Sequence, residues 1–218
     1  MIAALTRIAC GFALLSSLFC IGCTPGDAGE PAAAAKERLY RHIDTKRFRE
    51  QARLAKTFCA REGMDTRICL LADMSIPSGK ARLVAWDFRK DTFLTAGLMS
   101  HGCGAAPWGK DESREQPVFS NRPDSHCSSL GKYKVGKRGY SEWGIHVNYL
   151  PHGLEPTNSN AQARQIVLHG WDAIPDQEVY PDGAPEGWGC PAVSNACMTT
   201  LDSLLRRSKR PVLLWLYR

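Results

Sequence analysis

The sequence predicts a mainly β domain with flanking helices, and three observations support this fold class. Short apolar runs at residues 68–75, 81–89 and 92–100 are separated by turn-forming residues, a pattern typical of consecutive antiparallel strands. The chain ends in a run at 212–217 that is almost wholly apolar, which indicates a central strand. Amphipathic stretches lie before the first run and before the last, and these predict the helices.

The composition is that of one ordinary globular domain. A chain of 218 residues suffices for one domain with a proper core and appendages. The formal net charge of +6 suits a polyanionic neighbour, although a solvated basic surface explains the same charge without any partner. No basic element with interleaved aromatic residues is present, so we expect no nucleic-acid binding.

The N-terminus predicts a targeting segment. In residues 1–22, Arg7 precedes an apolar run that is too short for a membrane span, as in a signal peptide. The sequence Ile-Gly-Cys ending at Cys23 resembles the end of a bacterial lipobox, with Cys20 where Leu is usual. We therefore expect lipidation and a membrane anchor at Cys23, with a plain cleaved signal peptide as the alternative. No Asp follows Cys23, so the expected location is the periplasm, anchored to the outer membrane.

A linker and a helical segment come next. Residues 23–31 have the composition of a linker, residues 32–66 are expected to be helical, and the main domain occupies 67–218. The second helix is predicted from about 46 to 61, with Asp44 or Thr45 as its N-cap. Its apolar face is formed by Phe48, Ala52, Ala55 and Cys59.

The stretch 163–195 carries the most informative side chains. An apolar run at 166–168 is expected to form a strand that delivers His169, and a glycine-rich turn presents Cys190 between Gly189 and Pro191. A cysteine is a strong nucleophile only as a thiolate, and a nearby imidazole commonly generates one. Glycine before the cysteine keeps the approach open and leaves backbone N–H groups for an oxyanion.

A helix is predicted directly after this turn. Ser194 or Asn195 is the expected N-cap, and Pro211 prevents the helix from continuing into the last strand. Its apolar stripe is formed by Met198, Leu201, Leu204 and Leu205.

These motifs resemble the L,D-transpeptidase family, bacterial cysteine enzymes that remodel peptidoglycan. Seventeen residues separate His169 from the sequence Gly-Trp-Gly-Cys-Pro at 187–191, which is similar to the divergent branch of the family whose motif reads GCP. Further similarities are the Pro-Ser-Gly turn at 77–79, Ser-His-Gly at 100–102, Phe-Ser-Asn at 119–121 and Ser-Ser-Leu-Gly at 128–131. The resemblance covers most of residues 68–218.

The resemblance implies a β-sandwich or barrel and a cysteine-dependent acyl transfer on peptidoglycan stem peptides, without a cofactor. Cys190 would attack the peptide carbonyl, and His169 would take and return protons. The backbone N–H groups of Cys190 and Gly189 would receive the oxyanion, and the Gly170 carbonyl would orient the imidazole. The implied partners are stem peptides, and nothing in the sequence sets the oligomeric state.

Three further residues are candidates for substrate binding. Trp188 could form a wall of the cleft or anchor the loop in the core. Arg164 could meet a substrate carboxylate or serve a structural role. His101 lines the cleft by resemblance, with an ordinary loop histidine as the alternative. The loop at 171–188 is interpreted as a lid whose acidic residues attract an acceptor amine, or as a plain acidic surface loop.

The cysteines of an exported protein are expected to pair. We expect the disulfides Cys59–Cys69 and Cys103–Cys127, which leave Cys190 reactive and Cys197 as a buried helix thiol. An alternative is a zinc site, whose ligands would be His101, Cys103, His126 and Cys127. Their spacing is not standard for zinc, so we expect no metal.

Two other functions remain open at this point. One is hydrolysis of wall peptides by an L,D-carboxypeptidase or an amidase. The other is a wall-binding lipoprotein without catalytic activity, which the intact pair of His169 and Cys190 argues against.

Overall fold

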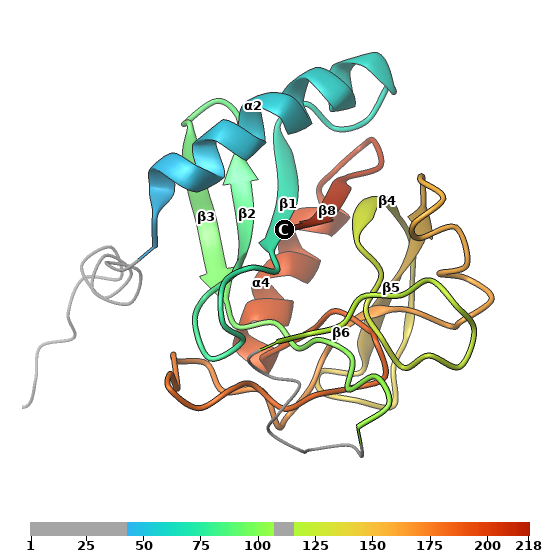
Figure 1. Ribbon diagram of the computed structural model, residues 1–218. Coiled ribbons are helices and arrows are strands. Elements are labelled where there is room, and N and C mark those ends of the chain that lie inside the picture. Colours follow the sequence, from blue (N-terminus) through green and yellow to red (C-terminus); the bar gives the residue numbers. More distant parts are fainter. Residues whose placement is uncertain (1–42, 107–115) are drawn as a thin grey trace, which may run out of the picture.

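The computed structural model describes residues 43–106 and 116–218 (Figure 1). The signal peptide expected at 1–22, the lipidation site Cys23, the linker at 23–31 and nearly all of the first expected helix lie outside the described residues. No helix in the described ranges is long and apolar enough to cross a membrane.

The described strands form one eight-stranded sheet, so the prediction of a mainly β fold with flanking helices is confirmed. Its order is β3-β2-β1-β8-β4-β5-β6-β7. The first three strands form the predicted antiparallel meander. The strands are β1 (Ile68–Asp73), β2 (Leu83–Asp87), β3 (Thr92–Gly97), β4 (Gly131–Tyr140), β5 (Val147–Gly153), β6 (Leu168–Gly170), β7 (Ala192–Val193) and β8 (Leu213–Tyr217).

The sheet curls until its two ends meet. β3 and β7 stand at opposite ends of the strand order, yet an antiparallel bridge joins Met99, two residues after β3, to Val193 in β7. The sheet therefore approaches a closed barrel, in which β7 has a neighbour on both sides. This closure brings residues 99–103 alongside the turn that precedes β7.

β1 and β8 form the centre of the sheet and are covered on both faces. β8 pairs in parallel with β1 and antiparallel with β4, as expected for a final apolar strand. In β1, Leu70 and Ala72 face the core beneath helix α4, whereas Cys69 and Leu71 face a second core beneath helix α2. Burial on both faces explains why β1 is apolar from Ile68 to Ala72 and why β8 is largely apolar.

The two described helices begin at the predicted caps. α2 (Thr45–Arg61) starts after Asp44, whose side chain accepts a hydrogen bond from the backbone of Arg47, and it buries the four predicted apolar residues against the sheet. α4 (Asn195–Arg206) starts after Ser194 in the same way and packs on the opposite face (Figure 1). A side-chain oxygen at the N-cap satisfies a backbone N–H that has no partner within the helix.

Two expectations need correction. The strand expected at 166–168 is shifted, because β6 begins at Leu168 and His169 lies in its middle, where β5 and β7 pair with it. The expected disulfides are absent: all six cysteines in the described ranges are free thiols. Cys59, Cys69, Cys103 and Cys127 are buried. Cys59 and Cys69 pack in the core beneath α2 as small apolar side chains, whereas the Cys127 thiol donates to the Ser125 carbonyl oxygen at 3.2 Å.

Candidate active site

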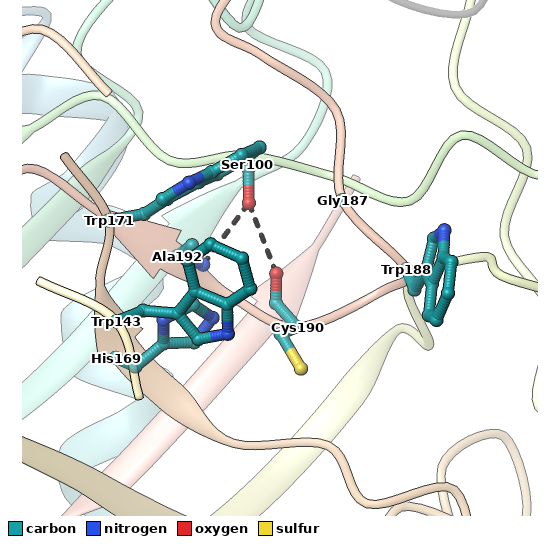
Figure 2. Close-up of a pocket in the computed structure, with 8 residues that line it drawn as sticks. All are labelled: Ser100, Trp143, His169, Trp171, Gly187, Trp188, Cys190 and Ala192. Atoms are coloured by element: carbon teal, nitrogen blue, oxygen red, sulfur yellow. Dashed lines mark hydrogen bonds between the residues drawn. The ribbon is translucent and has the colours of Figure 1, made fainter. Parts of the chain in front are cut away.

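The structure brings His169 and Cys190 to one cleft of about 270 Å³. β6 and β7 pair in parallel with His169 opposite Ala192, so the turn before β7 must present Cys190 beside the histidine. The cleft is lined by Ser100, Trp143, His169, Trp171, Gly187, Trp188, Cys190 and Ala192 (Figure 2). Most of this lining is aromatic or aliphatic, with a hydroxyl, an imidazole and a thiol as its chemical groups.

His169 is held as a neutral base. Its ring is 8% exposed, and Nδ1 lies 2.8 Å from the carbonyl oxygen of Gly170. Burial lowers the pKa of His169, and the Gly170 carbonyl only partly opposes this effect. The neutral ring donates its proton from Nδ1 to that carbonyl, which leaves Nε2 as the acceptor.

Cys190 rests as a thiol. The residue is half-buried, and its Sγ accepts a hydrogen bond from the backbone N–H of Val167 at 3.4 Å. Burial raises the pKa of the Cys190 thiol, while the Val167 N–H and the positive charge of Arg164 work in the opposite direction. Among the described residues, no hydrogen bond joins Sγ to His169.

The backbone around Cys190 is clamped by two serines that sequence reasoning did not single out. The Ser100 hydroxyl donates to the Cys190 carbonyl at 3.1 Å and accepts from Ala192 N. The Ser128 hydroxyl donates to the Gly189 carbonyl at 3.2 Å and accepts from Gly102 N. Both serines belong to motifs that carry the family resemblance, which was the only signal in the sequence.

This clamp leaves the N–H groups of the turn available. Within residues 43–106 and 116–218, no group accepts a hydrogen bond from the backbone N–H of Gly189 or Cys190. Gly189 has a φ of +101°, and a Cβ there would lie 2.3 Å from the Cys127 carbonyl oxygen. Only glycine fits this conformation, which is the kind of turn that presents N–H groups to an oxyanion.

Three tryptophans form the walls of the cleft. Trp188 is 65% exposed and stacks on His126 with ring centroids 5.0 Å apart. Trp143, which the sequence did not identify, is 51% exposed and meets Trp171 edge to face. Figure 2 shows Trp143 and Trp171 on the His169 side and Trp188 on the other side of Cys190.

The other two candidate binding residues have mainly internal partners. Arg164 donates to the carbonyl oxygens of Ser120 and Cys127 and to the Ser129 hydroxyl, and it lines a neighbouring depression rather than the Cys190 cleft. The expectation that His101 lines the cleft is wrong. Its side chain is buried between Arg82 and Glu186 because residues 100–103 are covered by the closing turn.

The zinc alternative has no support in the structure. The ring nitrogens of His101 face Arg82 and Glu186, and His126 stacks on Trp188. In the part of the chain that the structure describes, no group of three or more His, Cys, Asp or Glu side chains could hold a metal ion.

The loop at 171–188 is docked along the turn between β1 and β2. The N–H of Val179 donates to the Gly79 carbonyl, Ala184 N donates to the Ser78 hydroxyl, and the Glu178 carboxylate accepts from Ala81 N. The loop covers one side of the cleft through Trp171, but several of its carboxylates have internal partners. Glu186 is buried, and Asp172 accepts from Asn195 at 2.8 Å.

Comparisons with known proteins identify the family. A family model for the L,D-transpeptidase catalytic domain matches residues 40–215. Among solved structures, the chain is similar to the L,D-transpeptidase from Xylanimonas cellulosilytica DSM 15894, with 18% identity, a TM-score of 0.38, and coverage of 69% of this chain and 60% of that chain. It is also similar to the helical cell shape determining protein Pgp2 from Campylobacter jejuni, with 13% identity, a TM-score of 0.42, and coverage of 75% and 55%.

The chain thus spans little more than half the length of these two structures. No curated protein matches it.

Proposed function

Because the chain belongs to the L,D-transpeptidase catalytic domain family, we propose that it transfers acyl groups between peptidoglycan stem peptides through a thioester on Cys190. The observation that carries the proposal is the shared cleft of Cys190 and His169, in which the turn carbonyls are tied back and the N–H groups are left available. The family gives the reaction class and the substrate class, and the residues of the cleft give the roles.

The first half of the reaction forms the thioester. His169 Nε2 takes the thiol proton as Sγ attacks the carbonyl of the L-centre of the diamino acid at position three of the stem. The N–H groups of Gly189 and Cys190 hold the negative oxygen of the tetrahedral intermediate. When this intermediate collapses, the carbon–nitrogen bond breaks and the imidazolium gives its proton to the departing D-Ala amine.

The second half releases the thioester. An acceptor amine from another stem loses a proton to His169, attacks the thioester carbon and expels the Cys190 thiolate, which regains a proton from the imidazolium. The aromatic walls would hold the peptide so that the acceptor competes with water, because positioning can supply an effective molarity of about 10⁵ M or more.

Hydrolysis is the second candidate, because the contacts of the loop at 171–188 weaken the argument for an amine acceptor. If water replaces the amine, the protein is an L,D-carboxypeptidase or an amidase. The sequence suggested that acidic residues of this loop attract a cationic acceptor, but Glu178, Glu186 and Asp172 have protein partners or are buried. Fewer carboxylates are therefore available to an amine than the sequence suggested.

Incubation with tetrapeptide muropeptides, followed by mass spectrometry, distinguishes these candidates. Transpeptidation yields dimers joined between two diamino-acid residues, together with free D-Ala. Tripeptides alone, at high acceptor concentration, identify a carboxypeptidase. Full turnover by the Cys190→Ala variant would contradict the thioester mechanism.

The location is also a proposal, and it rests on the sequence of residues 1–23 alone. A lipid on Cys23 would anchor the enzyme in the periplasm at the outer membrane. Mass spectrometry of the mature N-terminus and fractionation of the envelope test this. An unmodified N-terminus in the soluble fraction would favour a plain signal peptide.

A further inference from the structure

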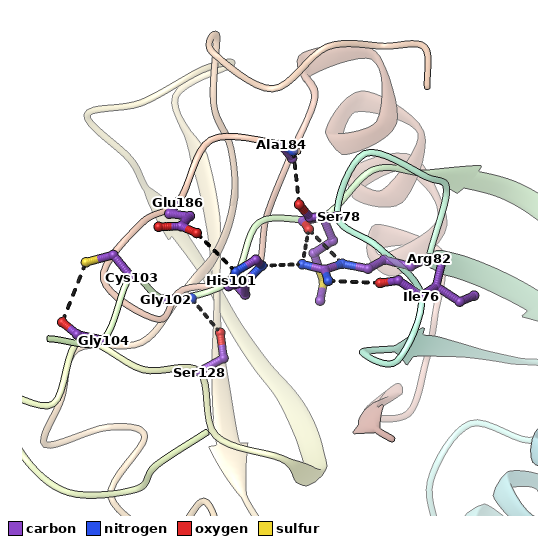
Figure 3. Close-up of polar contacts among 11 residues, drawn as sticks. Ile76, Ser78, Arg82, His101, Gly102, Cys103, Gly104, Ser128, Ala184 and Glu186 are labelled. Carbon is purple, nitrogen blue, oxygen red and sulfur yellow. Dashed lines mark hydrogen bonds and ion pairs between the residues drawn. The ribbon is translucent and has the colours of Figure 1, made fainter. Parts of the chain in front are cut away.

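A buried arginine stands at the start of a chain of polar side chains that leads toward the active site. Arg82 directly precedes β2 and is fully buried. Its Nε and Nη2 donate to the Met99 carbonyl oxygen at 2.9 and 2.6 Å, and its Nη1 donates to the Ile76 carbonyl oxygen at 3.2 Å. Nη2 also lies 2.9 Å from His101 Nδ1 (Figure 3).

This contact fixes the tautomer of His101. A guanidinium can only donate, so Nδ1 of His101 must accept, and the neutral ring therefore carries its proton on Nε2. Nε2 faces the Glu186 carboxylate, with 3.4 Å between Nε2 and Oε1. The side chains of Arg82, His101 and Glu186 are all fully buried, so a cation and an anion face each other across one polarised ring.

Arg82 and Glu186, the outer members of this row of side chains, belong to different parts of the fold. Arg82 is attached to the β1–β2 meander, whereas Glu186 lies four residues before Cys190 in the turn that carries the nucleophile. The segment at 100–103, which contains His101, forms backbone hydrogen bonds to that turn. The His101 carbonyl oxygen accepts from Gly187 N at 2.9 Å, and Cys103 N donates to the Gly187 carbonyl oxygen. Ser100 holds the Cys190 carbonyl.

Burial of the charged side chains of Arg82 and Glu186 is an inefficient way to stabilise the fold. Removal of a charge from water costs several kcal/mol, and well-packed apolar side chains often stabilise a core as well as a buried ion pair does. Burial lowers the pKa of Arg82 to about 9, and only the nearby Asp73 opposes this effect. A directional network is therefore better explained by the geometry that it imposes than by stability.

We propose that Arg82, His101 and Glu186 form a positioning network that fixes the turn carrying Cys190 relative to His169. None of the three side chains touches the substrate cleft, so they act through the backbone of residues 186–190. The inference rests on the proposed thioester function, because it assigns these residues to the same site.

The decisive comparison is between two changes at His101. In His101→Gln, the amide oxygen can accept from Arg82 and the amide nitrogen can donate to Glu186, whereas His101→Leu breaks both contacts. We expect His101→Leu to lower kcat for D-Ala release by about 100-fold with little change in KM, as for a misplaced reacting group. His101→Gln should recover most of this loss.

A second readout needs no turnover. The rate at which iodoacetamide alkylates Cys190, followed against pH by mass spectrometry, reports the environment of the thiol. If the network holds the turn, His101→Leu should move the midpoint of this profile down toward that of an exposed cysteine, because a loosened turn no longer buries Sγ. This measurement stands even if the wild-type protein shows no transpeptidase activity.

The control is Asp65→Asn, which removes a buried carboxylate that does not line the cleft. Asp65→Asn should leave kcat and the alkylation profile unchanged when the folded fractions are equal. If His101→Leu fails to fold, Glu186→Met decides, because it keeps most of the volume and removes the oxygens that face Nε2 of His101. An unchanged kcat and alkylation profile in that variant, or equal effects of His101→Leu and Asp65→Asn, would overturn the proposal.

Discussion

Ser100→Ala tests whether the clamp on the Cys190 turn matters for catalysis. Ser100 is fully buried, and its hydroxyl both donates to the Cys190 carbonyl and accepts from Ala192 N. In the alanine variant, the Cys190 carbonyl and the Ala192 N–H lose the hydroxyl as their hydrogen-bond partner. An unsatisfied buried group costs about 1–3 kcal/mol, and the bond to the Cys190 carbonyl is only part-buried, so the free energy of unfolding should fall by roughly 2–4 kcal/mol.

For a domain of this size, that loss corresponds to a fall in Tm of roughly 5–15 °C. The Cys190 carbonyl is also free to turn, so the adjacent N–H groups lose their fixed direction toward the oxyanion. We therefore expect kcat for D-Ala release to fall by about 100-fold at a temperature where the variant is fully folded.

The assay pairs calorimetry with steady-state kinetics, and Ser129→Ala is the matched control. Ser129 is also buried, and it donates to Ser120 and accepts from Arg164, but it does not touch the Cys190 backbone. Ser129→Ala should lower Tm and leave kcat near the wild-type value. Equal kcat losses in the two variants would refute the role of the clamp.

Three further predictions follow from the described contacts. Since burial lowers the pKa of His169 below its ordinary value of 6.5, the base stays neutral through that pH, and the acid limb of kcat/KM should lie below it; a limb at or above 6.5 would contradict this. Gly79→Ala should detach the loop at 171–188 and raise its proteolysis rate, because a Cβ at Gly79 would lie 1.8 Å from the Asp182 carbonyl oxygen; unchanged cleavage would show that the docking is not needed. Burial raises the pKa of Asp65, but hydrogen bonds from Arg67 and Ile68 outweigh burial and lower the pKa below 3.8. The ionised carboxylate therefore stabilises the fold above pH 3.8, and this stabilisation is lost as the pH falls through the lowered pKa. Asp65→Asn should therefore lower Tm at pH 7 but not at about pH 2, and equal losses at both would exclude the ionised carboxylate as the cause.

Much of the fold was predictable because its signals are local. The run that became β1 is apolar from Ile68 to Ala72 because both of its faces are buried. Asp44 and Ser194 are side chains that cap helices wherever a helix begins, and the structure uses both in this way. His169 and Cys190 were found because a glycine-flanked cysteine and an apolar run before a histidine are recognisable without knowledge of their neighbours.

The remaining features depend on contacts between distant segments. His101 was expected to line the cleft by resemblance, with an ordinary loop histidine as the alternative, and it is buried because Gly102 pairs with Gly187 when the sheet closes. Nothing in the sequence singled out Arg82, because its carbonyl partners come from a loop and from the segment after β3. No local feature of the sequence predicts that the Ser100 hydroxyl contacts the Cys190 carbonyl.

Trapping of the acyl-enzyme tests the central claim most directly. The protein is mixed with a tetrapeptide muropeptide, quenched in acid within the first turnovers, digested and analysed by mass spectrometry. The thioester mechanism predicts a mass increase on the peptide that contains Cys190, equal to the muropeptide minus D-Ala, which disappears when an acceptor amine or hydroxylamine is added. Turnover without any adduct on Cys190, or an adduct on another residue, would contradict it.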